Sequence, residues 1–325
     1  MSIPLACTRC KTILVPDAFA TFTSESEFLC HGCQAVFLNH SGCLDMTVTK
    51  SCEREHYDGV YSPESESHTP STSNAWAPLW SDPLHPERRK MLDILGNVEG
   101  KSMLLLGNGL SAKELHFASL GAEVIYSDLS IEAVKGARRL AGPPAHAGKS
   151  AFHAIDAFNL PLPDECLDVV YGWAFVHHLE DLDRFLAEVK RVLKPGGACY
   201  FYDNANSRAW QLAKFTVLFP LMKLSHWKWG ISPEDRKATA KGGFTNAEVQ
   251  EYQERHGFRG SIFLRFGLLY SLFNRGRLKL TGNSPLLEPA SSVVVPALFH
   301  LDEYLARRSH LYENSTLGLI WGFRK

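Results

Sequence analysis

Short apolar runs and helix-like segments alternate along the chain from about residue 82 onward. The run Met103–Leu106 precedes a helix-compatible segment that begins near Ser111, and a second run covers Ala122–Tyr126. Three further apolar runs occupy residues 151–155, 166–175 and 198–204. The middle one of these is apolar enough for a strand buried on both faces. Strands interleaved with helices in this order predict a parallel sheet with helices on both faces.

The segments between the apolar runs have the periodicity of amphipathic helices. Residues 88–95, 131–141 and 181–194 are predicted helices. In the last of them the apolar side chains recur at helical spacing: Leu182, Phe185, Leu186, Val189, Val192 and Leu193. The KPGG sequence at 194–197 ends this helix, because a basic last turn before Pro-Gly is a typical helix terminus.

Composition divides the chain into three zones. Residues 1–50 are rich in cysteine and lack helical periodicity. Residues 51–81 are interpreted as a linker, because Ser, Thr, Pro and Glu dominate their centre. Residues 82–325 form the α/β domain, with apolar insertions at about 205–243 and 267–314.

The overall charge balance excludes some classes of partner. The 325 residues are 45% hydrophobic and carry a formal net charge of −1, so no general field attracts nucleic acid. No apolar run reaches the ~20 residues needed to cross a bilayer. The first ten residues, MSIPLACTRC, lack the basic and apolar regions of a secretory leader, which predicts a cytoplasmic protein.

Four of the eight cysteines form two CxxC pairs near the N-terminus: Cys7 with Cys10, and Cys30 with Cys33. Each CxxC turn brings two sulfurs to one metal, so two turns at this spacing predict a zinc ribbon with tetrahedral thiolate coordination of Zn²⁺. Four thiolates leave no open coordination position, and a structural role is therefore expected. A redox pair and a disulfide are the alternatives, and the duplicated motif and a reducing compartment disfavour both.

A glycine turn, Gly107-Asn108-Gly109, follows the first apolar run, and Asp128 ends the second. A strand, a glycine turn, a helix and a second strand tipped by a carboxylate form the first half of a nucleotide-binding βαβ unit. The glycines allow the backbone to approach a ligand closely. Asp128 is placed to accept hydrogen bonds from a ribose diol.

Together these motifs resemble the class I S-adenosylmethionine-dependent methyltransferases, in particular the small-molecule group called methyltransferase type 11. The resemblance rests on the glycine turn, Asp128, Asp156, LPLPDECLDVV at 160–170 and LKPGG at 193–197, in that order. It covers roughly residues 85–265 and the last strand. It implies an α/β fold with a Rossmann-like, doubly wound and mostly parallel seven-stranded sheet, to which the zinc ribbon and helical insertions are added.

The resemblance also implies S-adenosyl-L-methionine as cofactor and a set of residues that bind it. These are Gly107, Asn108 and Gly109 below the methionine and ribose, Asp128 and Leu129 at the ribose hydroxyls, Asp156 and Ala157 at the adenine edge, Trp173 near the reacting methyl, and Tyr57 in an aromatic lid formed by residues 51–81. One position departs from the family pattern. Leu105 stands where the family usually has an acid that supports the charged methionine end of the cofactor.

Methyl transfer from a sulfonium is an in-line displacement, which requires above all that the acceptor be held close to the methyl group. A nearby base helps when the acceptor is a hydroxyl or carboxyl group. His178 and His177 are the candidate catalytic residues, because they follow the fourth strand at the edge where open α/β sheets bind their ligands. Packing of one of them against the next helix is the alternative.

The two apolar insertions favour a small, partly apolar methyl acceptor over a polyanion, and a homodimer is a candidate assembly. Trp210, Phe215, Phe219, Trp227 and Trp229 of the first insertion are expected to roof an apolar pocket or to form core and dimer contacts. Nucleic acid is disfavoured as a partner, since the basic clusters are short. An RNA methyltransferase guided by the zinc ribbon and a non-catalytic scaffold with a methyltransferase fold are the alternative functions.

Overall fold

The computed structural model describes residues 3–20, 25–47, 52–62, 76–141, 150–206, 243–273, 288–313 and 316–325. Residues 63–75 of the predicted linker and large parts of both predicted insertions, 207–242 and 274–287, lie outside these ranges. The five aromatic residues expected to roof a pocket lie outside the described residues as well. In the part of the chain that is described, no helix is long and apolar enough to cross a membrane.

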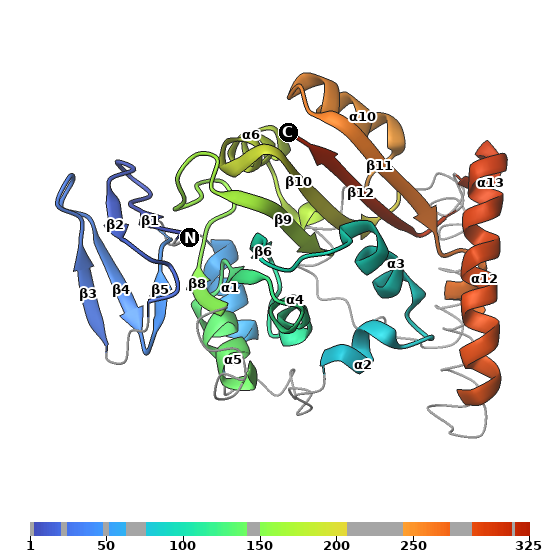
Figure 1. The fold of residues 1–325 in the computed structure, drawn as a ribbon, viewed down its shortest axis with the longest axis horizontal. Helices are drawn as coiled ribbons and strands as arrows, with labels where there is room; N and C mark the ends of the chain where they lie inside the picture. The colour runs from blue at the N-terminus through green and yellow to red at the C-terminus, as the bar shows by residue number, and fades with distance from the viewer. Residues whose placement is uncertain are drawn as a thin grey trace.

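Seven strands form the centre of the molecule in the order β11-β12-β10-β9-β6-β7-β8 (Figure 1). Their bounds are β6 Ser102–Leu106, β7 Glu123–Asp128, β8 Ser150–Ala154, β9 Leu167–Trp173, β10 Leu193–Asn204, β11 Arg259–Phe266 and β12 Gly318–Arg324. Neighbouring strands from β10 to β8 are parallel, whereas β12 is antiparallel to both β10 and β11. The predicted mostly parallel, doubly wound sheet is confirmed. Its strand order reverses between β6 and β9, where such sheets bind ligands.

Three strands of the N-terminal module, which comprises β1 to β5, continue this sheet: β5, β4 and β3 follow β8, whereas β1 and β2 form a separate two-stranded antiparallel sheet. The strands of the module are β1 Leu5–Ala6, β2 Ile13–Val15, β3 Ser26–Leu29, β4 Val36–His40 and β5 Cys43–Asp45. β5 pairs in parallel with β8, through Leu44 opposite His153 and Asp45 opposite Ala154. Within the described residues the sheet therefore has ten strands, with β3 at one edge and β11 at the other.

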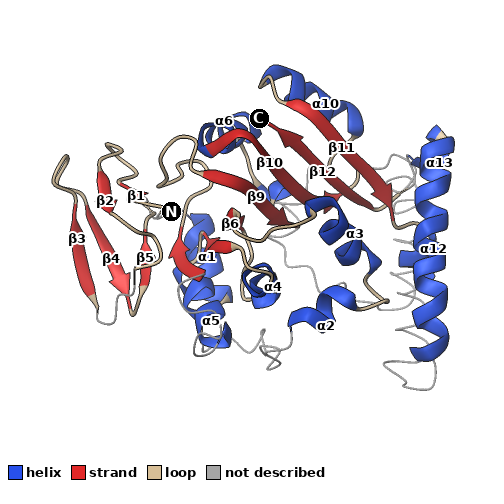
Figure 2. Cartoon of the chain, in the orientation of Figure 1, coloured by secondary structure: helices blue, strands red, loops and turns tan. Residues whose placement is uncertain are grey.

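Helices cover both faces of the central sheet (Figure 2). α6 (Leu182–Val192) and α10 (Asn246–Arg255) contribute to one apolar core, together with residues of the N-terminal module. The opposite core holds residues of α3 (Pro86–Leu95), α4 (His116–Ser119), α5 (Ile131–Ala141) and α12 (Glu288–Arg308). Other helices in the described part of the chain include α1 (Cys52–Val60), α2 (Trp76–Ser81) and α13 (His310–Glu313), and the short 3₁₀ helices η1 (Ala112–Leu115) and η2 (Val176–His178).

The helices predicted from periodicity at 88–95, 131–141 and 181–194 correspond to α3, α5 and α6. α6 begins where Asp181, as N-cap, accepts a hydrogen bond from the Arg184 backbone N–H at 3.0 Å. The segment after the glycine turn differs from the prediction, because it opens as η1 before a single turn of α4.

Candidate functional site

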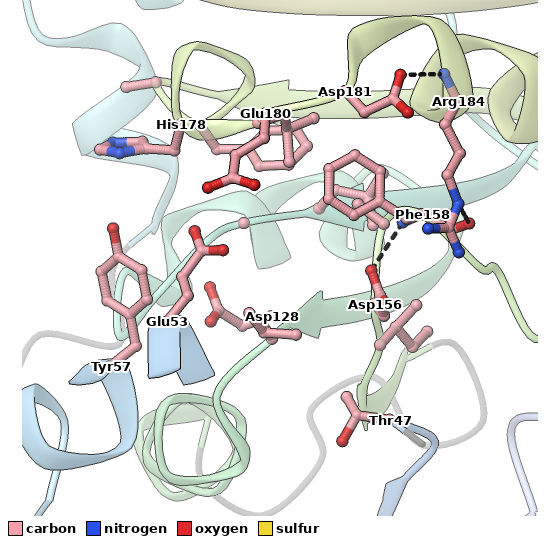
Figure 3. Close-up of a pocket in the computed structure, with 18 of the residues that line it drawn as sticks. Thr47, Glu53, Tyr57, Asp128, Asp156, Phe158, His178, Glu180, Asp181 and Arg184 are labelled. Carbon is pink, nitrogen blue, oxygen red and sulfur yellow. Dashed lines mark hydrogen bonds between the residues drawn. The ribbon is translucent and has the colours of Figure 1, made fainter. Parts of the chain in front are cut away.

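A cavity of about 470 Å³ lies at the carboxyl ends of the parallel strands (Figure 3). Its floor follows β6, β7, β8 and β9 in turn, through residues at the end of each strand or just after it: 106–107, 128–129, 155–158 and 174–175. α1 and the start of α6 complete the wall. The cavity therefore occupies the position that the strand order predicts for a ligand.

The glycine turn lies at the floor of this cavity in a backbone conformation that only glycine adopts easily. Gly107 has φ of 64° and Gly109 has φ of 56°. A Cβ atom at Gly107 would lie 2.4 Å from the Phe175 ring, and one at Gly109 would lie 2.7 Å from the Tyr61 hydroxyl. Glycine is thus required at both positions, because of the positive φ angle and because a Cβ atom would clash with a neighbouring ring or hydroxyl.

Asp128 is tied to the glycine turn through its carboxylate. The Gly109 N–H donates to Oδ2 at 2.8 Å and the Ser130 N–H donates to Oδ1 at 3.0 Å. Burial raises the pKa of Asp128, and these two backbone hydrogen bonds oppose the rise. The carboxylate lines the cavity beside Leu129, and Asp156 with Ala157 lines the neighbouring wall. The structure therefore brings together the residues predicted to bind ribose and adenine.

Two buried polar side chains in and after the glycine turn lack hydrogen-bond partners. Neither amide atom of Asn108 has one among the described residues, and the same holds for both carboxylate oxygens of Glu114 in η1. Lys113 Nζ nevertheless lies 2.6 Å from Glu114 Oε1 and forms an ion pair with it, and neither Asn108 nor Glu114 is among the residues that line the cavity. Leu105 is fully buried in the core formed by α3, α4, α5 and α12.

The two predicted catalytic histidines have different environments. His178 lines the cavity, and its ring lies edge-on to Tyr57 with centroids 6.5 Å apart. His177 is buried behind it, and its Nδ1 lies 2.7 Å from Oδ1 of Asp203 in β10. The two imidazole rings are 4.2 Å apart. Burial raises the pKa of Asp203, and the hydrogen bond with His177 opposes the rise.

α1 forms the wall opposite His178 and lies where the sequence indicated a linker. Glu53, Tyr57 and Tyr61 line the cavity from this side, and Figure 3 shows the Glu53 and Glu180 carboxylates approaching each other across it. Burial and the nearby charge of Glu180 raise the pKa of Glu53. The aromatic residue predicted to cover the cofactor, Tyr57, thus lies beside the cavity.

Three of the predicted cofactor residues, Asn108, Gly109 and Trp173, are not among the residues that line this cavity. Trp173 lies elsewhere. It is stacked on Tyr202 with ring centroids 4.1 Å apart, and Lys113 Nζ lies 5.5 Å from its ring centre. It packs against the core formed by α3, α4, α5 and α12. Its predicted role beside the reacting methyl group stays a prediction.

The four N-terminal cysteines converge as their spacing predicts. Their Sγ atoms all lie within 4.8 Å of one another. The Cys7 and Cys33 sulfurs are 3.6 Å apart, and those of Cys10 and Cys30 are 3.4 Å apart. Tetrahedral Zn²⁺ with Zn–S bonds of about 2.3 Å requires sulfurs roughly 3.8 Å apart. The geometry fits a four-thiolate zinc site, which the cluster suggests without demonstrating the metal.

Comparison with known proteins finds sequence similarity within the central domain. Residues 104–201 match the family Methyltransf_11, described as a methyltransferase domain. Tocopherol O-methyltransferase of Arabidopsis thaliana, a chloroplastic protein, is 28% identical over 199 residues, which are 50% of this chain and 57% of that protein. The ubiquinone/menaquinone biosynthesis C-methyltransferase UbiE of Acidiphilium cryptum is 33% identical over 109 residues, 34% of this chain and 39% of that protein.

The aligned part is thus only about half, or less, of the length of these curated relatives. Among solved structures, the Haemonchus contortus phosphoethanolamine N-methyltransferase 2 in complex with S-adenosyl-L-methionine is similar to the chain with a TM-score of 0.50. The match covers 86% of this chain and 61% of that one at 12% identity, which shows a shared fold.

Proposed function

We propose, from the premise that residues 104–201 of this chain form a class I methyltransferase domain, that the protein transfers a methyl group from S-adenosyl-L-methionine to a small-molecule acceptor. One observation carries the proposal. Gly107 of the glycine turn, Asp128 and Asp156 lie at or just after the ends of three different strands and line a single cavity at the point where the strand order of the sheet reverses.

The residues present fit the cofactor. S-adenosylmethionine carries a ribose diol, an adenine and an amino-acid end, and each has polar groups that need partners. Asp128 offers a carboxylate to the diol, and Asp156 lies in the adjoining wall for the adenine. The buried amide of Asn108, in the glycine turn, has no hydrogen-bond partner among the described residues.

His178 is proposed as the base that accepts a proton from the methyl acceptor. The sulfonium supplies the electrophilic methyl group, and the acceptor atom displaces it in line. His178 lines the cavity, so it can reach an acceptor that enters beside Tyr57. His177 donates its Nδ1 hydrogen to Asp203, which fixes the ring that packs against His178. His177 therefore acts by positioning His178.

The acceptor is proposed to be a small and partly apolar molecule. The relatives are named for methyl transfer to tocopherol and in quinone biosynthesis. Phe158 and Phe175 line the cavity together with its polar groups, so an acceptor with both characters would fit. The zinc ion proposed at the four cysteines would have a structural role, because four thiolates leave no position for a substrate.

Calorimetric titration with S-adenosyl-L-methionine tests the proposal. The wild-type chain should bind the cofactor, and Asp128→Asn should bind it about 10- to 100-fold more weakly, because a hydrogen bond to a charged group contributes about 1.5–3 kcal/mol. Asp164→Asn is the matched control, since that carboxylate is 75% exposed and remote from the cavity lining. Absence of binding at millimolar cofactor would leave only a scaffold with a methyltransferase fold.

A second measurement tests the base. His178→Ala should lower kcat by about 100-fold or more while cofactor affinity changes little, because general base catalysis contributes about 10²–10⁴-fold. Transfer of a labelled methyl group to metabolites of a cell extract reports the activity. Partial rescue by added imidazole would support proton transfer. A kcat equal to that of the wild type would exclude the role.

A further inference from the structure

Helix α1 has two sets of polar contacts, and only one of them belongs to the cavity. Glu53 and Tyr57 line the cavity. Arg54 and Asp58, one helical turn apart, instead contact the N-terminal module and the start of α5. α1 thus connects the four-cysteine module to the residues proposed to bind the cofactor.

Arg54 is held by three oxygen atoms from two segments. Its guanidinium pairs with the Asp45 carboxylate at the end of β5 and donates to the Thr47 hydroxyl. Its Nε lies 3.4 Å from Asp58 Oδ2. The Arg54 side chain is 13% exposed and that of Asp45 is 10% exposed, so solvent screens this pair less than a surface pair.

Asp58 passes the connection on to the glycine turn. Its Oδ1 accepts a hydrogen bond from the Ser130 hydroxyl at 2.6 Å, and the Ser130 backbone N–H donates to Asp128. Asp128 in turn accepts the Gly109 N–H. An unbroken series of polar contacts therefore runs from Asp45 through Arg54, Asp58, Ser130 and Asp128 to Gly109.

We infer that Arg54 is a positioning residue of the cofactor site, which holds α1 between Asp45 of the N-terminal module and the Asp58–Ser130–Asp128 series. The inference rests on the proposed function, since Asp128 is the residue that meets the ribose. Arg54 also balances the charges of Asp45 and Asp58. Without it, Asp58 is an uncompensated carboxylate close to Asp128, and it gains by turning toward water and releasing Ser130. The N-terminal module is then part of the cofactor site and more than an appended domain.

The chain offers a matched control pair. Arg89 and Asp93 in α3 are also one turn apart, and Nε of the arginine lies 3.4 Å from the carboxylate, as in the Arg54–Asp58 pair. The two side chains are 67% and 57% exposed. Arg89→Gln therefore removes the same local helix contact without the connection to a second segment.

Titration of the full-length chain with S-adenosylhomocysteine by calorimetry tests the inference. Arg54→Gln should raise the Kd at least tenfold, Asp45→Asn should raise it in the same direction, and Arg89→Gln should stay within twofold of the wild type. Thermal unfolding checks that each variant is folded. If Arg54→Gln does not fold, the Kd values of Arg54→Lys and Asp45→Asn test the inference instead, because both variants retain part of the polar contacts between Asp45, Arg54 and Asp58.

The outcomes separate the two claims. A wild-type chain that binds no cofactor overturns the proposed function and this inference together. A wild-type chain that binds, with Arg54→Gln, Arg54→Lys and Asp45→Asn all within twofold of it, overturns the inference alone. Hydrogen exchange gives a readout independent of the cofactor. The amides of α1 and of residues 129–132 should exchange faster in Arg54→Gln than in the wild type, whereas their exchange rates in Arg89→Gln should equal those of the wild type.

Discussion

In the central sheet β6 is buried at all five positions, whereas in the N-terminal module β3 has three exposed positions of four. β3, β4 and β5 of the module belong to the same sheet as the central strands, yet different interactions stabilise the two regions. The central strands lie between two apolar cores, one on each face. In the N-terminal module β2, β3 and β4 have a one-sided core, because their buried residues Val15 and Phe37 belong to one apolar core while Ile13, Leu29, Val36 and Leu38 are exposed. β5 differs, since it is buried at all three positions and its Cys43 belongs to the opposite core.

A one-sided core is a weak source of stability for a segment of this size, so other links must supplement it. The four cysteines are one such link, and His153 is another. His153 accepts the Leu44 N–H at Nδ1 (3.3 Å) and donates from Nε2 to the Ala18 carbonyl (2.9 Å). From this comparison we expect the stability of the module to depend on metal binding and on pH. The stability of the central sheet should instead depend on the volumes of its buried side chains.

The largest effect is expected from removing the zinc ion proposed at the four cysteines. A chelator, or Cys30→Ser, should abolish hydrogen-exchange protection in β1 to β5, because binding of structural zinc contributes about 10 kcal/mol or more to folding of small domains. Amides of β6 and β9 should stay protected. Cys166→Ser is the control, since this thiol is outside the cluster and donates to the Pro163 carbonyl. An equal loss of hydrogen-exchange protection in both regions would contradict the idea that different interactions stabilise the module and the central sheet.

The next effect concerns the central core. Phe185 is fully buried in α6 and lies 5.5 Å from Phe201 and 5.7 Å from Phe175, measured between ring centroids. Phe185→Ala should lower the free energy of unfolding by about 3–5 kcal/mol, measured by urea denaturation. Ala187→Ser, on the exposed face of the same helix, should change it by less than about 0.5 kcal/mol. A similar loss in both variants would mean that the core contact is not the cause.

The third prediction concerns the loss of stability at acidic pH. Burial lowers the pKa of His153 from 6.5 to about 4. The unfolded chain then binds the proton first, so this contribution is present above pH 6.5 and is lost as the pH falls toward 4, by about 3 kcal/mol in total. Urea denaturation at pH 7 and pH 5 measures it. His153→Gln should reduce the pH dependence, and an unchanged pH dependence would exclude His153 as its source.

These contrasts also show what the sequence could predict. Strands β6 to β10 and helices α3, α5 and α6 were predicted from the local pattern of apolar residues, and the glycine turn and the cysteine pairs from their motifs. The segment after the turn was not, because it forms η1 and a single turn of α4. The pairing of β5 with β8 could not be predicted from the sequence, because it joins a three-residue strand to one more than 100 positions away. It also involves a hydrogen bond from the Leu44 N–H to the His153 side chain. Asp203 likewise carries no local signal for its contact with His177. The Arg54 and Asp58 spacing was a usable signal of a helix inside the presumed linker.

The smallest effect is expected on the outer face of the N-terminal module. In β4, Val36 is 51% exposed while its neighbour Phe37 is 3% exposed, as expected for a strand with one buried face. Val36→Thr keeps the β-branched shape and should change the free energy of unfolding by no more than about 0.5 kcal/mol. Phe37→Leu, the matched change on the inner face, should cost about 1 kcal/mol or more. Thermal unfolding of both variants compares the two faces directly. A loss above about 1 kcal/mol in Val36→Thr would show that the outer face is covered in solution, and the one-sided core inferred for this module would then be wrong.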